Sequence, residues 1–119
     1  PQVNVSKRVI VIEYAENEGG QPKSYALINP EITISSEETE FGIEGCLSIP
    51  NIAGEVERYS NIVVKGFNKH GNKVKVKANG WLARIFQHEI DHLDGILFTD
   101  RAIKIWQTEV KPTQPIAEK

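Results

Sequence analysis

Residues 79–95 read NGWLARIFQHEIDHLDG, and this stretch decides the fold. Its apolar residues recur at spacings of three and four, which is the period of a helix that buries one face. Asn79 can act as the N-cap of this helix, and Gly95 is placed to end it. The sequence therefore predicts a central helix that begins at Gly80 and ends shortly before Gly95.

The residues before this helix have the composition and alternation of β-strands. Expected strands, rich in β-branched residues, are 8–14, 24–29, 31–35, 61–67 and 73–77. Residues 68–72 read as the turn of a hairpin, 36–40 as a polar loop, and Pro50 as the end of the extended segment that contains Cys46. The predicted fold class is α+β, with antiparallel β-sheets packed around one central helix that carries the motif HExxH.

The end of the chain is expected to contribute less to the fold. Residues 102–110 are predicted to form a short helix, and Pro112 and Pro115 predict a frayed tail after it. At 119 residues the chain has the length of one ordinary domain. We therefore expect a single domain over residues 1–111 and a C-terminal tail over 112–119.

Charge and hydropathy exclude two classes of partner. Lysine and arginine number 14 and aspartate and glutamate 16, scattered along the chain, so no basic stripe predicts direct binding to nucleic acid. The longest apolar runs are far too short to span a membrane.

A single cysteine, Cys46, excludes an internal disulfide and suits a reducing compartment.

HExxH is the pattern most suggestive of chemistry. On a helix, His88 and His92 lie on one face and can bind a single ion, with Glu89 beside it to move a proton. The alternative is an ordinary helix with two hydrogen-bonded histidines. A catalytic metal site needs a third protein ligand, for which His70 in its tight turn is a poor candidate, leaving Cys46 or a carboxylate. By itself, Cys46 would more often be a buried core residue.

Two short motifs resemble those of a known family. EGCLS at residues 44–48 and QHEIDH at 87–92 are similar to the second and third motifs of the peptide deformylases, metalloenzymes that remove the formyl group from nascent bacterial and organellar proteins. Pro1-Gln2 is similar to the end of that family's first, glycine-rich motif. The resemblance runs from Pro1 to about Arg101, so we expect a deformylase-like domain that lacks its N-terminal segment.

The resemblance implies a mechanism. Cys46, His88 and His92 would hold a divalent metal ion, and Glu89 would take a proton from water and give it to the departing amine. A thiolate ligand admits Fe(II), Zn(II), Ni(II) or Co(II), and the family implies Fe(II) as the physiological ion. The backbone N–H of Leu47 and the side chain of Gln2 would stabilise the negative charge on the oxygen of the intermediate.

The resemblance also implies a substrate and its contacts. N-formylmethionyl peptides of nascent chains are the expected substrate, with the ribosome as a further partner and the bacterial cytoplasm, or an organelle, as the location. Trp81 and Ile85 match positions that line the methionine pocket, although plain core packing has comparable weight. Glu44 and Gly45 belong to the same expected substrate site. Arg58 matches a residue that forms a buried ion pair with Glu44 and orients the loop of Cys46.

Peptide recognition should differ in one detail, because Ala53 replaces the arginine that many bacterial members carry seven residues after the cysteine.

Two rival functions follow from the residues of the predicted metal site. A zincin-type metallopeptidase shares HExxH, but no histidine follows His92 to serve as its third ligand and Cys46 would have no role. A truncated, inactive domain could hold a structural metal, but it would need a fourth ligand, and none is evident.

Overall fold

The structure is a computed structural model that describes residues 8–15, 19–46 and 49–108. The strands form two sheets, with the order β1-β2-β5-β6 in one and β3-β4-β7 in the other, and all neighbouring strands are antiparallel. The expected α+β class is confirmed. The elements are β1 (Val9–Tyr14), β2 (Lys23–Ile34), β3 (Thr39–Cys46), β4 (Ile49–Tyr59), β5 (Asn61–Phe67), β6 (Lys73–Asn79), α1 (Gly80–Leu93), α2 (Phe98–Arg101) and β7 (Lys104–Gln107).

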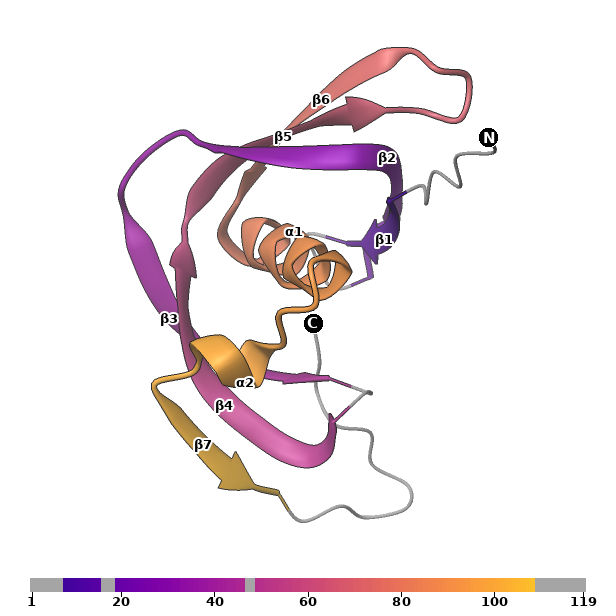
Figure 1. Cartoon of the computed structure of the whole chain (residues 1–119). Helices are drawn as coiled ribbons and strands as arrows, with labels where there is room; N and C mark the ends of the chain where they lie inside the picture. Colours follow the sequence, from indigo (N-terminus) through magenta and orange to yellow (C-terminus); the bar gives the residue numbers. More distant parts are fainter. Residues whose placement is uncertain (1–7, 16–18, 47–48, 109–119) are drawn as a thin grey trace, which may run out of the picture.

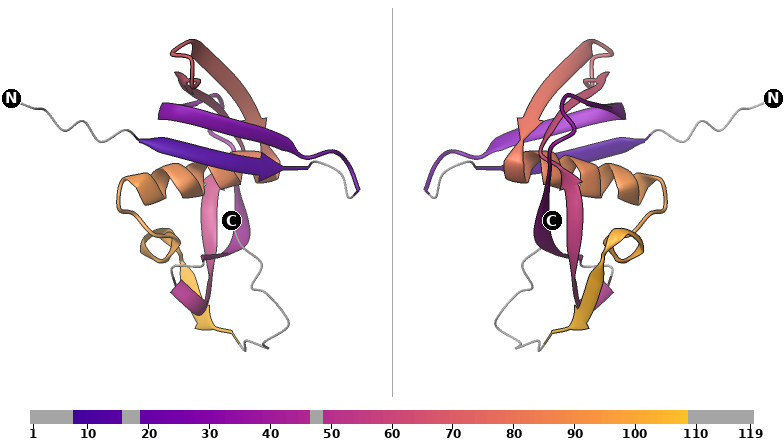
Figure 2. Two further views of the ribbon diagram at one scale, coloured as in Figure 1. Left: turned by 90° about the vertical axis from the view of Figure 1, so that its right-hand side faces the viewer. Right: turned by 90° about the vertical axis from the view of Figure 1, so that its left-hand side faces the viewer.

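Helix α1 lies between the two sheets (Figures 1 and 2). It contacts β1, β2, β5 and β6 on one side and β4 on the other. The buried apolar cluster between α1 and the four-stranded sheet consists of Ile10, Ile12, Leu27, Ile62, Val64, Ala78, Leu82, Ala83, Ile85, Phe86 and Ile90. Since α1 is covered on both sides, its polar residues facing the second sheet are buried as well.

The ends of α1 lie where the sequence places them. Asn79 is the N-cap residue, but its side chain makes no capping hydrogen bond. The N–H of Gly80 instead donates at 2.8 Å to the carbonyl of Ser60, the residue between β4 and β5, which satisfies one donor at the start of the helix. Gly95 has a φ of 78° and donates to the carbonyl of His92, which ends the helix. Among the described residues, no helix is long and apolar enough to cross a membrane.

The hairpin of β5 and β6 is confirmed. Its register pairs Asn61 with Asn79 and Phe67 with Lys73. Lysines of β6 face solvent while the alternate side chains face the core, as the sequence pattern predicts. His70 is exposed in the turn between the strands, so the structure gives it no part in a buried site.

The predicted interruption at Pro30 is wrong, because β2 runs through it as one strand. Asn29 adopts a φ of 53°, and the pairing with β5 shifts between Ile28 and Glu31. A bulge of this kind accommodates a proline, which has no N–H to donate to the ladder. Pro30 itself is fully buried, and its packing therefore holds the bulge in place.

Two boundaries around the Cys46 segment also differ from expectation. Thr39 and Glu40, predicted as loop, are the first residues of β3 and pair with Tyr59 and Arg58. Pro50 does not end the extended segment, because it lies inside β4. The antiparallel pairing of β3 with β4, which follows it in the chain, decides both boundaries. Thr39 pairs with Tyr59, which is too far along the sequence for the local pattern at 36–40 to indicate it.

The predicted helix over 102–110 is wrong. Residues 104–107 form β7, which pairs with Ile52 to Glu55 at the edge of β4. The stretch IKIW at 103–106 is rich in β-branched and aromatic residues, and the open edge of β4 supplies hydrogen-bond partners that favour a strand. The expected tail, 112–119, lies outside the described residues.

Candidate metal centre

His88 and His92 lie one turn apart on α1 but in different surroundings. The side chain of His88 is buried, Glu89 is half-buried, and His92 is exposed. The ring of His88 stacks on that of Phe98 in α2, with centroids 6.2 Å apart. The HExxH motif therefore runs from the interior of the protein to its surface, and its first histidine is fixed by packing.

Glu44 of β3 orients the imidazole of His88. Its Oε1 lies 2.9 Å from Nδ1 of His88. Burial raises the pKa of Glu44, but hydrogen bonds from Arg58 and His88 outweigh this effect and lower the pKa to about 2. The ionised carboxylate is an acceptor only, so Nδ1 carries the proton, and in the neutral ring Nε2 keeps its lone pair. Metal-binding histidines are held by a carboxylate in this way.

The thiol of Cys46 is also close to His88. Burial lowers the pKa of His88, whereas hydrogen bonds with Glu44 and Cys46 raise it, and the net direction is upward. Cys46 is the last residue of β3, two positions after Glu44, and is half-buried. The structure thus brings His88 of α1 together with Glu44 and Cys46 of β3, from which it is widely separated in the sequence.

The donor types fit a divalent metal ion, because an anchored imidazole and a thiol lie side by side with a second histidine one helical turn further on. However, within residues 8–15, 19–46 and 49–108 no group of three or more histidine, cysteine, aspartate and glutamate side chains is arranged so that it could hold an ion. The complete ligand set Cys46, His88 and His92 therefore stays a prediction.

The expected ion pair between Glu44 and Arg58 is confirmed. Nε and Nη2 of Arg58 donate to the two carboxylate oxygens of Glu44 at 2.8 and 2.9 Å, and both side chains are buried. Burial lowers the pKa of Arg58, but its contacts with Glu44 and Asp91 raise it overall, so the guanidinium stays charged. This two-point contact fixes the plane of the Glu44 carboxylate that faces His88.

Two further members of this cluster were not predicted from the sequence. Nη1 of Arg84 donates to Oε2 of Glu44 at 2.6 Å, and Oδ2 of Asp91 accepts from Nη1 of Arg58 at 2.7 Å. A signal was present, because Arg84, Gln87, His88 and Asp91 recur at helical spacing as one polar stripe. Such a stripe ordinarily faces solvent, and only the second sheet makes this one a buried site.

The expected substrate residues are placed differently from one another. Gly45 is buried next to Cys46, and Ile85 belongs to the apolar core. Trp81 is 44% exposed, and the guanidinium of Arg84 lies 5.7 Å from the centre of its ring. Core packing is therefore the observed role of Ile85 but not of Trp81. Gln2 and Leu47 lie outside the described residues.

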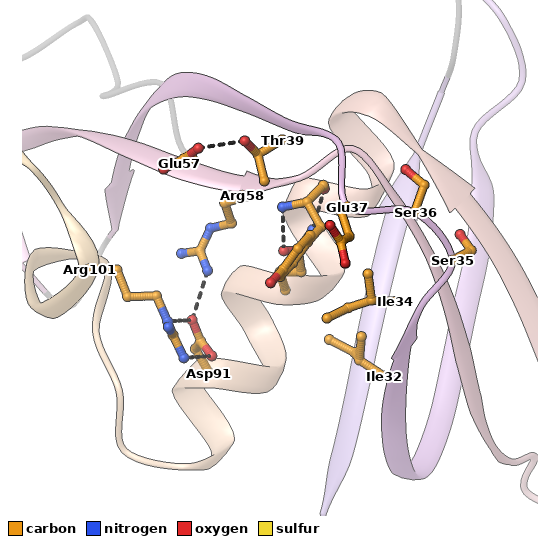
Figure 3. A pocket seen from close by; sticks show the side chains of 12 residues that line it. Ile32, Ile34, Ser35, Ser36, Glu37, Thr39, Glu57, Arg58, Asp91 and Arg101 are labelled. Carbon is orange, nitrogen blue, oxygen red and sulfur yellow. Dashed lines mark hydrogen bonds and ion pairs between the residues drawn. The ribbon is translucent and has the colours of Figure 1, made fainter.

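A pocket of about 930 Å³ opens beside the charged cluster (Figure 3). Arg58, Asp91 and Arg101 form its polar wall, and Ile32 and Ile34 of β2 face them. Asp91 accepts hydrogen bonds from both arginines. None of the residues expected to bind substrate lines this pocket, so it is distinct from the predicted substrate site.

The profile of the polypeptide deformylase family matches residues 1–107. A peptide deformylase from Halothermothrix orenii is 51% identical over 105 residues, which cover 88% of this chain and 65% of that protein. A second, from Symbiobacterium thermophilum, is also 51% identical, but the match covers 46% of its length. The chain thus spans about half to two thirds of the length of these relatives.

Solved structures give the same result. The crystal structure of peptide deformylase from Thermotoga maritima matches with a TM-score of 0.71 and 44% identity, over 85% of this chain and 65% of that one. A peptide deformylase from Acinetobacter baumannii bound to Met-Ala-Ser matches with a TM-score of 0.71 and 41% identity, over 79% and 62% of the two chains. Sequence motifs, fold and relatives agree, and the chain belongs to the peptide deformylase family.

Proposed function

We propose that this protein hydrolyses the formyl amide at the N-terminus of newly made proteins and releases formate. The observation that carries the proposal is the contact between Glu44 and Nδ1 of His88, which leaves Nε2 of the buried imidazole available to a metal beside the thiol of Cys46. Membership of the peptide deformylase family supports this reaction over peptide-bond cleavage.

Cys46, His88 and His92 are the proposed metal ligands. Fe(II) is the proposed physiological ion, with Zn(II), Ni(II) or Co(II) as substitutes, because a ligand set of one thiolate and two imidazoles accepts each of them. When bound, such a cation polarises a carbonyl group and lowers the pKa of a coordinated water toward about 7. The chain supplies the geometry, since Glu44 and Phe98 fix the ring of His88.

Glu89 is the proposed general base and acid. It follows His88 on α1 and is half-buried, so its carboxylate is accessible to water. Glu89 would accept the proton of the attacking water and return it to the nitrogen of the departing amine. Leu47, through its backbone N–H, and Gln2, through its side-chain amide, are the proposed donors to the oxygen that becomes negative.

The proposed substrates are N-formylmethionyl peptides. The Acinetobacter baumannii relative is solved with Met-Ala-Ser, a peptide that begins with methionine. Gly45 beside Cys46, Glu44, Ile85 and the partly exposed Trp81 are the proposed surroundings of the first residue. We further propose that the protein acts in the bacterial cytoplasm, on chains that emerge from the ribosome.

The decisive experiment compares formyl-Met-Ala-Ser with unformylated Met-Ala-Ser as substrates of the full chain. We expect formate and intact Met-Ala-Ser from the first peptide and no reaction with the second. Glu89→Gln should lower kcat/KM by about 10²- to 10⁴-fold, and Gln2→Ala by about 10²- to 10³-fold. Glu13→Gln, an exposed carboxylate of β1, is the matched control and should leave the rate unchanged.

Two results would contradict the proposal. Cleavage of the peptide backbone in either substrate would indicate a zincin-type peptidase instead. Retention of bound metal without formate release would indicate a structural metal site. The metal content of the natively purified protein, measured together with its intact mass, should show one divalent ion per chain, and Cys46→Ala should abolish it.

A further inference from the structure

Arg84 ties α1 to both long strands of the second sheet. Its side chain is 3% exposed, and its guanidinium makes three hydrogen bonds. Nη1 donates to the carboxylate of Glu44 at 2.6 Å and to the carbonyl of Val56 at 3.0 Å, while Nη2 donates to the carbonyl of Glu40 at 2.7 Å. One side chain thus fixes β3 at two points and β4 at a third.

Gly42 makes room for this guanidinium. A Cβ added to Gly42 would lie 2.7 Å from Cζ and 2.8 Å from Nε of Arg84, far inside van der Waals contact. The backbone of Gly42 is not in the left-handed region, so its conformation does not require glycine. Only the close approach of the Arg84 side chain does. Because three hydrogen bonds hold the guanidinium, it cannot move aside without losing them.

The bonds from Arg84 bear directly on the position of Glu44. Oε2 of Glu44 accepts from Arg84 and from Nε of Arg58, while Oε1 accepts from Nη2 of Arg58 and contacts Nδ1 of His88. If Arg84 is withdrawn, Oε2 keeps one donor, and only the two-point contact with Arg58 then holds the carboxylate, which can tilt about that contact. The imidazole of His88, whose Nδ1 contacts Oε1, is then oriented less closely.

We propose that Arg84 is a positioning residue for His88, acting through the carboxylate of Glu44, and that Gly42 is glycine because this guanidinium lies against it. The inference rests on the proposed function only in that His88 is taken as a metal ligand. The contacts that link Gly42 to His88 through Arg84 and Glu44 do not depend on the reaction, and they can be tested without measuring catalysis.

The experiment is a double-mutant cycle with Gly42→Ala, Arg84→Met and the combination. The first readout is the pair of ring-nitrogen NMR shifts of His88 in metal-free protein, at a pH high enough for the ring to be neutral. We expect the wild-type ring to hold its proton on Nδ1, and each single variant to show a mixture of the two tautomers. The double variant should equal Arg84→Met, because methionine makes no hydrogen bonds that hold it in place and can turn away from the added methyl group.

Cobalt affinity is the second readout. Outer partners of metal-binding histidines typically change metal affinity by about 10- to 100-fold, and we expect the lower end, about 10-fold, for each single variant and no further loss in the double. Arg84→Lys should restore part of the loss, since an ammonium can reach Glu44 but cannot make all three contacts. Arg8→Met, which removes an exposed arginine bound to Asp94, is the control and should change neither readout.

Additive effects in the double variant, or unchanged His88 shifts in Gly42→Ala, would overturn the inference. If Arg84→Met does not fold, Gly42→Ala by itself decides, because its methyl group displaces the guanidinium while the arginine side chain is still present. If the wild-type protein binds no cobalt, the proposed function fails, whereas the His88 shifts still decide whether Arg84 positions the ring.

Discussion

The two sides of α1 are held by different forces. Toward the four-stranded sheet, the helix packs through apolar side chains such as Phe86 and Ile90. Toward β3 and β4, the contacts are buried charges, two carboxylates against two guanidinium groups, contributed by Glu44, Asp91, Arg58 and Arg84. Gln87 adds hydrogen bonds to both backbone groups of Tyr59.

The apolar side and the charged side of α1 contribute differently to the stability of the fold and to the geometry of the site. Apolar burial is non-directional and tolerates changes of shape that keep the volume. Buried ion pairs contribute little net stability, because desolvation offsets their attraction, but the loss of one partner is costly and they fix distances and angles closely. The apolar side therefore stabilises the fold, and the charged side sets the position of His88.

The largest expected effect comes from removing the shared carboxylate. Glu44→Gln leaves Arg58 and Arg84 as uncompensated buried charges, and it should lower the free energy of unfolding by about 3–5 kcal/mol. Chemical denaturation of the metal-free protein measures this. Glu57→Gln, an exposed carboxylate on β4, should change stability by less than about 0.5 kcal/mol. Equal effects of the two variants would show that the cluster has no special role.

The second largest effect is expected from acid, which should lower the stability that the charged side of α1 contributes. The pKa of Glu44 is lowered to about 2 in the folded protein from 4.5, so the unfolded chain binds more protons between these values. The contribution of Glu44 is therefore fully present above about pH 4.5 and is lost as the pH falls toward 2, by roughly 3 kcal/mol in all. The free energy of unfolding, measured at several pH values, should fall more steeply for wild type than for Glu44→Gln as the pH is lowered. Equal slopes for the two proteins would show that Glu44 is not the source of the pH dependence.

Asp91 tests how far the cluster extends toward solvent. It is partly buried and accepts from Arg58 and from the half-exposed Arg101. Asp91→Asn should cost about 1–3 kcal/mol, because the amide can still accept from Nη1 of Arg58 but no longer carries the negative charge that the guanidinium faces. Arg101→Met removes only the exposed partner and should cost about 0.2–1 kcal/mol. Thermal unfolding of both variants checks this order, and a reversed order would place the sensitive contact at the surface.

On the apolar side we expect a smaller effect than that of Glu44→Gln or Asp91→Asn. Ile62→Val removes one buried methylene group and should cost about 0.5–1.5 kcal/mol, measured by denaturant unfolding. It should leave the ring-nitrogen shifts of His88 unchanged. Glu44→Asp also removes one methylene group, but it withdraws a carboxylate from four fixed contacts. We expect it to cost more than Ile62→Val and to alter the His88 shifts, and the opposite result would remove the distinction between the two sides.

Much of the fold could be predicted from local patterns. The apolar period and the glycine at 95 define α1 within a residue or two, and the sequences flanking 68–72 define the hairpin. These elements are local, so the residues that form them also specify them. EGCLS and QHEIDH were enough to identify the family and the candidate residues Cys46, His88 and Glu89.

Tertiary structure alone decided the remaining features. The segment KIWQ became β7 because the edge of β4 was open to it, and β3 began at Thr39 because β4 paired there. Arg84 and Asp91 lie on a polar helix stripe whose period would equally fit a solvated face. The second sheet covers that stripe and turns its charges into a buried cluster around His88. A periodic pattern specifies which side chains share a face, but only long-range packing decides whether that face meets water or protein.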